Sequence, residues 1–151
     1  FVINKKRHAN LKQIKSMLYN GWSVGSHGHN HLSYYMLNNY QIYDDLKRSK
    51  DILEDLLDIK IDTFTPPFGY FKSSYLSLVK KAGYSDIYLN KCYLDESIIN
   101  SELNISVRIP IYLIDNLYSI QRKISNNIYQ EKLDKMIHYF SIATVFVKKI
   151  Y

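Results

Sequence analysis

Trp22-Ser23-Val24-Gly25-Ser26-His27-Gly28-His29-Asn30-His31 is the most informative segment of the chain, because a short apolar strand pattern runs directly into three histidines. Neutral imidazole nitrogens bind metal ions. His27 and His31 lie four residues apart, so on one helical turn both rings would face one ion while His29 points elsewhere. We therefore predict that His27 and His31 are metal ligands. The alternative is an exposed histidine-rich tract that holds no ligand.

Helix and strand patterns alternate on both sides of the histidines. Apolar residues at helical spacing predict helices over 8–20, 39–58, 73–83 and 115–140. Extended or alternating patterns predict strands over 22–26, 62–65, 85–89 and 105–111. This alternation indicates an α/β protein with a parallel sheet or barrel, in which sites form at the carboxyl ends of the strands. The histidines and the Pro66-Pro67 pair both follow such ends.

Composition narrows the class of protein. The 151 residues are 46% hydrophobic, as expected of one folded domain over 1–151. The single cysteine, Cys92, excludes an internal disulfide framework. The net charge of +6 is spread among acidic residues, which favours a solvated surface and no nucleic-acid partner. No apolar run is long enough to predict a membrane span, and the first residues do not read as a signal peptide.

Two motifs carry a resemblance to a known family. Val24-Gly25-Ser26-His27 with His31, and then Phe64-Thr65-Pro66-Pro67-Phe68-Gly69-Tyr70, resemble consecutive motifs of the polysaccharide deacetylase family, the NodB homology domain of carbohydrate esterase type. One amphipathic helix separates them, in the family's order. The resemblance extends from Phe1 to about Leu89 and implies a distorted (β/α) barrel. The family's Thr-Phe-Asp-Asp-Gly motif would precede Phe1, so we expect a partial domain that is incomplete at its N-terminus.

The resemblance also implies a reaction. Family members are metal-dependent hydrolases that remove acetyl groups, usually the N-acetyl of amino sugars in a polysaccharide, with a metal-activated water as nucleophile. His27 and His31 would hold the divalent ion, most often zinc, although cobalt, nickel and manganese suit such ligands. The Phe68 backbone N–H would stabilise the oxyanion, because Pro67 has no N–H. Pro67, Phe68 and Gly69 would bind substrate, and the family favours the cell envelope or the extracellular space.

Several positions depart from the family pattern. Thr65 stands where many members have an arginine that orients the catalytic base. We hypothesise that Arg108 supplies this guanidinium; the alternative is an arginine whose stem packs while its head reaches water. Asp44 and Asp45 are expected to be solvated on a helix face. His138, the only late histidine, is expected on a helix surface and not as the general acid of the family's late Leu-x-His motif.

Two other functions stay open. The chain could be a catalytically inactive remnant that binds carbohydrate or serves as a scaffold, or an unrelated α/β domain with a fortuitous histidine cluster. Among substrates, peptidoglycan, chitin-like oligomers, biofilm glucosamine polymers and lipopolysaccharide precursors are all compatible with the motifs.

Overall fold

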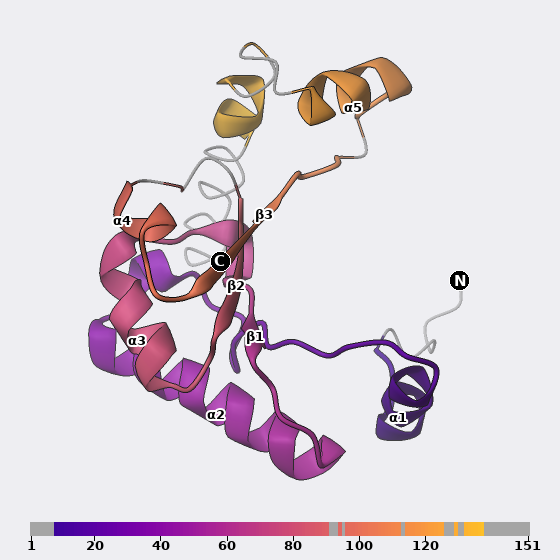
Figure 1. Ribbon diagram of the computed structural model, residues 1–151, viewed down its shortest axis with the longest axis vertical. Helices are drawn as coiled ribbons and strands as arrows, with labels where there is room; N and C mark the ends of the chain where they lie inside the picture. The colour runs from indigo at the N-terminus through magenta and orange to yellow at the C-terminus, as the bar shows by residue number, and fades with distance from the viewer. Residues whose placement is uncertain are drawn as a thin grey trace, which may run out of the picture.

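The centre of the molecule is a parallel sheet. The structure is a computed structural model that describes residues 8–90, 94, 96–112, 114–125, 129 and 132–137. Its strands β1 (Thr63–Phe64), β2 (Asp86–Asn90) and β3 (Asn104–Arg108) form a three-stranded sheet in the order β1-β2-β3, and both pairings are parallel (Figure 1). Ser26 extends the β1 edge through an isolated parallel bridge to Phe64. The α/β class with a parallel sheet is therefore confirmed.

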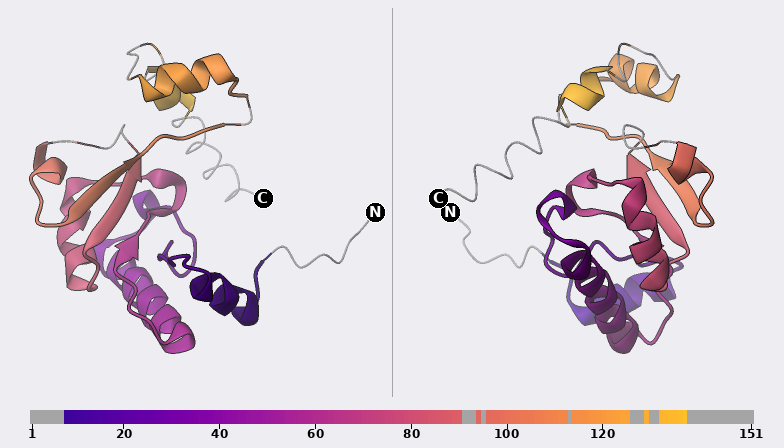
Figure 2. Two further views of the ribbon diagram at one scale, coloured as in Figure 1. Left: turned by 45° about the vertical axis from the view of Figure 1, so that its right-hand side comes forward. Right: turned by 90° about the vertical axis from the view of Figure 1, so that its left-hand side faces the viewer.

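Helices connect the strands and cover one face of the sheet. The described α-helices are α1 (Leu11–Tyr19), α2 (Asn39–Leu57), α3 (Leu76–Lys81), α4 (Glu96–Ile99) and α5 (Leu117–Ile124). Short 3-10 turns occupy Tyr34–Met36, Pro67–Gly69 and Ser73–Tyr75. The two views in Figure 2, with Figure 1, show α2 and α3 side by side on one face of the sheet, whereas α1 and α5 lie away from it.

The longest helix, α2, has sequence signals at both ends. The Asn38 side chain accepts a hydrogen bond from the Gln41 backbone N–H, and the Gln41 side chain accepts one from the Asn38 N–H, which forms a capping box. At the other end Asp58 adopts a left-handed conformation with φ of 55°, a common way to stop a helix. The capped helix places one apolar face against the sheet.

The core lies between the sheet and the helices α2 and α3. Its fully buried members come from all of these elements and their connections: Tyr34, Ile42, Leu46, Ile61, Phe64, Val79, Ile87 and Leu89. Tyr34 stacks on Phe64 with ring centroids 5.9 Å apart. Because Tyr34 lies just beyond the histidines and Phe64 just before the diproline, this core contact brings the two motifs together.

Some boundaries differ from the sequence-based expectation. The strand expected over 105–111 ends at Arg108, before Pro110, which has no N–H for a sheet ladder. The stretch 22–26 contributes only the bridge at Ser26. The expected final helix is described as α5 and as helical residues 132–137, and the short helix α4 was not predicted. The described strands form an open sheet, so the barrel stays a prediction.

Two further expectations meet the limits of the described residues. Cys92 and His138 both lie outside them. Among the helices that the structure describes, none combines the length and the apolar character needed to span a membrane.

Candidate functional site

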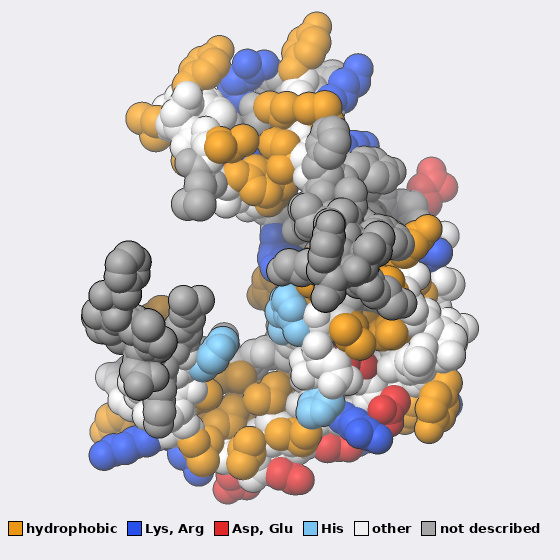
Figure 3. Space-filling view, turned by 180° about the vertical axis from the view of Figure 1, so that it is seen from behind, with side chains coloured by type: hydrophobic (Ala, Val, Ile, Leu, Met, Phe, Trp, Pro, Cys, Tyr) orange, Lys and Arg blue, Asp and Glu red, His pale blue; other side chains and the backbone are white. Residues whose placement is uncertain are grey.

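A loop, and not a helical turn, brings His27 and His31 together. The loop begins after the bridge at Ser26, and its residues 27–33 have no helical assignment, so the expected helical geometry is wrong. Positive φ values at Gly28 (77°) and His31 (51°) turn the backbone back on itself. The two imidazole centroids lie 5.0 Å apart with the rings tilted by 56°. In the space-filling view, histidine side chains are seen in separate places on the face viewed from behind, some of them at the edge of a hollow (Figure 3).

The His27 ring is oriented by the diproline segment. Its Nδ1 lies 2.8 Å from the Thr65 backbone oxygen. A carbonyl only accepts, so Nδ1–H donates and Nε2 keeps its lone pair. Desolvation lowers the pKa of His27, the Thr65 hydrogen bond opposes this shift, and the positive charges of His31 and Arg108 add to it. The neutral imidazole required of a metal ligand is therefore favoured at neutral pH.

The Pro67–Gly69 turn packs directly on the second histidine. The rings of His31 and Phe68 have centroids 4.9 Å apart. Phe68 has a positive φ of 56°, whereas the flanking Pro67 and Gly69 are buried. Left-handed backbone at a residue other than glycine is strained and concentrates at functional sites. The structure thus brings both sequence motifs to one place, with strained residues, His31 and Phe68, in contact across them.

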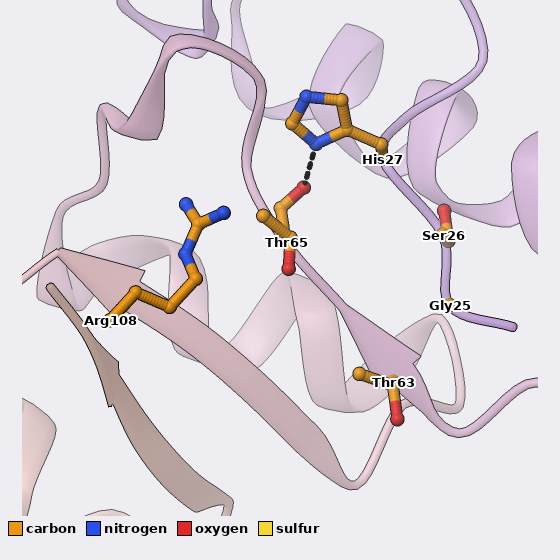
Figure 4. A pocket seen from close by; sticks show the side chains of 6 residues that line it. All are labelled: Gly25, Ser26, His27, Thr63, Thr65 and Arg108. Atoms are coloured by element: carbon orange, nitrogen blue, oxygen red, sulfur yellow. Dashed lines mark hydrogen bonds between the residues drawn. The ribbon is translucent and has the colours of Figure 1, made fainter. Parts of the chain in front are cut away.

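A pocket joins the His27 side of the loop to the end of β3. It has a volume of about 390 Å³ and is lined by Gly25, Ser26, His27, Thr63, Thr65 and Arg108. Figure 4 shows the Arg108 guanidinium extending from β3 toward Thr65 and His27. Its Nε is buried and finds no hydrogen-bond partner among the described residues, and burial lowers the pKa of Arg108. Arg108, 81 positions after His27 in the sequence, therefore lines the same pocket.

Sequence reasoning missed Asp45. The neighbouring Asp44 pairs with Arg48 in an exposed ion pair, as expected, but Asp45 is only 2% exposed, so the expectation of a solvated residue is wrong for it. The buried face of α2 includes Ile42, Asp45, Leu46 and Ser49, which is the i, i+3, i+4, i+7 spacing of a core-facing stripe. That spacing was the available signal, because Asp45 lies between two apolar core positions.

The chemistry of the donors fits part of a metal site. Zinc is held by four ligands in a tetrahedral arrangement, and imidazole nitrogen is one of its preferred donors. His27 and His31 offer two such donors from one loop. Within the described part of the chain, no three His, Cys, Asp or Glu residues are grouped so that they could hold a metal ion.

Comparisons with known proteins place the chain in a family. The profile of the family described as polysaccharide deacetylase matches residues 1–87, more than half of the 151 residues. The chain therefore belongs to the polysaccharide deacetylase family, which confirms the resemblance drawn from the two motifs. A comparison with curated protein sequences gives no match.

Three solved structures are similar to this chain. IcaB from Ammonifex degensii is 22% identical with a TM-score of 0.50, covering 54% of this chain and 40% of IcaB. A de-N-acetylase from Aggregatibacter actinomycetemcomitans is 15% identical with a TM-score of 0.60, covering 80% and 58% of the two chains. BC0361, a polysaccharide deacetylase from Bacillus cereus, is 22% identical with a TM-score of 0.61, covering 81% and 38%. At these identities the likeness shows a shared fold, and this chain spans between 38% and 58% of the length of each solved chain.

Proposed function

We propose that this chain carries the histidine pair and the substrate-binding turn of a metal-dependent deacetylase, which removes N-acetyl groups from the amino sugars of a polysaccharide. The observation that carries the proposal is that the imidazole rings of His27 and His31, with centroids 5.0 Å apart, lie beside the Pro67–Gly69 turn. Bound zinc, or another divalent ion, would act as a Lewis acid and activate water. Family membership supports the reaction class.

Each residue of the site has a role in this proposal. His27 presents Nε2, because its Nδ1–H is held by the Thr65 oxygen, and His31 supplies the second nitrogen. The backbone N–H of Phe68 donates to the acetyl carbonyl oxygen as negative charge develops on it. Pro67 and Gly69 shape the turn that admits the sugar.

Arg108 serves as the guanidinium that the family's pattern places at Thr65. Its buried Nε without a partner among the described residues, and its place in the His27 pocket, support this role. A guanidinium is a bidentate partner for a carboxylate, so Arg108 would hold the carboxylate base in position beside the histidines.

Zinc binding tests the ligand pair. Calorimetric titration of the 151-residue chain with Zn²⁺ should give weak binding, because two imidazoles leave half of a tetrahedral set to water. His27→Ala and His31→Ala should each weaken it further by at least about tenfold. His29→Ala is the matched control, since His29 belongs to the same loop. Zinc affinity that is equal in the His31→Ala variant and the parent would contradict the proposal.

Acetate release tests the reaction and separates it from the alternative. The full-length protein, supplied with zinc and an N-acetylglucosamine oligomer, should release acetate. Arg108→Gln should lower the rate by about 10- to 100-fold, the usual effect of losing a residue that orients a ligand or base. Arg48→Gln, an exposed arginine paired with Asp44, is the control. Oligomer binding without acetate release would favour the non-catalytic carbohydrate binder.

A further inference from the structure

Asp45 is a buried carboxylate, and its hydrogen-bond partners among the described residues belong to the histidine loop or to the turn after it. Its Oδ1 accepts from the Asn30 backbone N–H at 2.8 Å and from the Asn30 side-chain amide at 3.1 Å. Its Oδ2 accepts from the Tyr34 hydroxyl at 3.2 Å. The Asp45 side chain thus connects helix α2 to the segment that carries His31.

The described groups that donate hydrogen bonds to the Asp45 carboxylate are uncharged. In the part of the chain that the structure describes, no lysine or arginine forms an ion pair with Asp45, whereas Asp44 and Asp51 on the same helix each have one. Burying a carboxylate is unfavourable unless hydrogen bonds replace those it made to water. The three donors from Asn30 and Tyr34 do so, and the two donors of Asn30 belong to the loop itself.

The loop backbone also rests directly on the carboxylate. A Cβ added to Gly28 would lie 2.5 Å from Asp45 Oδ2. Gly28 and Asn30 are the residues next to His27 and His31, so Asp45 contacts the loop beside both histidines. His31 has a φ of 51°, a strained conformation that persists only where surrounding contacts impose it.

We propose that Asp45 is the positioning residue that sets the separation of the His27 and His31 rings. The inference rests on the proposed function, in which the two rings bind one divalent ion. A loop that is already in the binding conformation avoids the free-energy cost of ordering it. Residues that orient metal ligands typically contribute 10- to 100-fold to metal affinity.

The test compares Asp45 with its exposed neighbour. Zn²⁺ affinity is measured by calorimetry for the parent chain, Asp45→Ala, Asp45→Asn and Asp44→Ala, at a temperature where circular dichroism shows each to be folded. Asp45→Ala should weaken binding by about 10- to 100-fold. Asp45→Asn should lose less, because its oxygen can still accept from the Asn30 N–H. Asp44→Ala removes the same charge from the same helix and should bind as the parent does.

A second measurement does not require metal. Hydrogen exchange of the Asn30 amide should be faster in Asp45→Ala than in the parent and unchanged in Asp44→Ala. The amides of β2 should exchange at the parent rate in Asp45→Ala, because a general loss of stability would speed exchange there as well. Parent-like zinc affinity in Asp45→Ala would overturn the positioning role and leave the two-histidine proposal intact. Absence of zinc binding by the parent chain would overturn both.

Discussion

Gly28 is the residue on which the geometry of the histidine loop depends. It has a φ of 77°, and the Asp45 carboxylate occupies the space that a side chain would need. Gly21 has a similar φ of 84°, but nothing lies within 4 Å of the position of its missing Cβ. The two glycines therefore separate the backbone preference of glycine from the need for space.

Alanine substitutions at the two glycines should separate these two effects. Gly21→Ala should lower the free energy of unfolding by about 1 kcal/mol, from the strained φ alone. Gly28→Ala should cost about 1–3 kcal/mol more, because the added methyl displaces the loop from Asp45. Urea unfolding followed by circular dichroism measures both. Equal losses in the two variants would show that Asp45 does not crowd Gly28.

At the scale of elements, α2 is joined to the strand that follows it by a charged pair. Glu54 accepts a hydrogen bond from the Ile61 backbone N–H at 2.9 Å and pairs with Lys50 at 2.9 Å. Lys50 Nζ also donates to the Ile61 backbone oxygen and lies 5.1 Å from the centroid of the Tyr84 ring. These contacts fix the connection from α2 to β1, which ends at the diproline turn.

Acid unfolding should report on this connection. The Ile61 N–H, and then Lys50, lower the pKa of Glu54 below 4.5. Because the folded-state pKa lies below the unfolded one, Glu54 stabilises the protein above about pH 4.5 and loses this effect as the pH falls through the folded-state pKa. Glu54→Gln should flatten this part of the curve of unfolding free energy against pH. Superimposable curves for parent and variant would contradict the assignment.

Local sequence patterns predicted the helix α2 better than the strand before the histidines or the burial of Asp45. The helical spacing of apolar residues predicted a helix over 39–58, close to the observed α2 (Asn39–Leu57), because that spacing is a local property of the chain. A strand was predicted over 22–26, but only Ser26 of this stretch forms a bridge, because a strand depends on pairing with a distant segment. The burial of Asp45 was missed for a similar reason: its partners Asn30 and Tyr34 lie 15 and 11 residues away.

In the molecule as a whole, Lys123 connects the C-terminal helices to the segment that follows β3. Its side chain is buried, and its Nζ donates to Pro110 O at 2.9 Å and to Asp115 at 2.5 Å. It also pairs with Asp134 at 3.2 Å and lies 4.5 Å from the centroid of the Tyr112 ring. One ammonium group thus connects the segment after β3, the start of α5 and the helical residues 132–137.

Removing that ammonium should release the C-terminal helices and leave the core folded. Lys123→Met leaves two carboxylates without their cation, a change that typically costs about 3–5 kcal/mol in a buried setting. Hydrogen exchange should show loss of protection in α5, with α2 unaffected. Lys135→Met, at an exposed position, is the control. Loss of protection throughout the protein would show instead that α5 unfolds together with the core.

The α/β class, the extent of α2 and the two motifs could be predicted from the sequence, because periodicity and motif spacing are local properties of the chain. The folded structure was needed to find that His27 and His31 converge through a loop, that Arg108 lines the pocket of His27, and that Asp45 is buried against the histidine loop. These features depend on contacts between distant residues, such as the hydrogen bond between His27 and Thr65, 38 positions apart. Such contacts exist only when the sheet has aligned the ends of its strands.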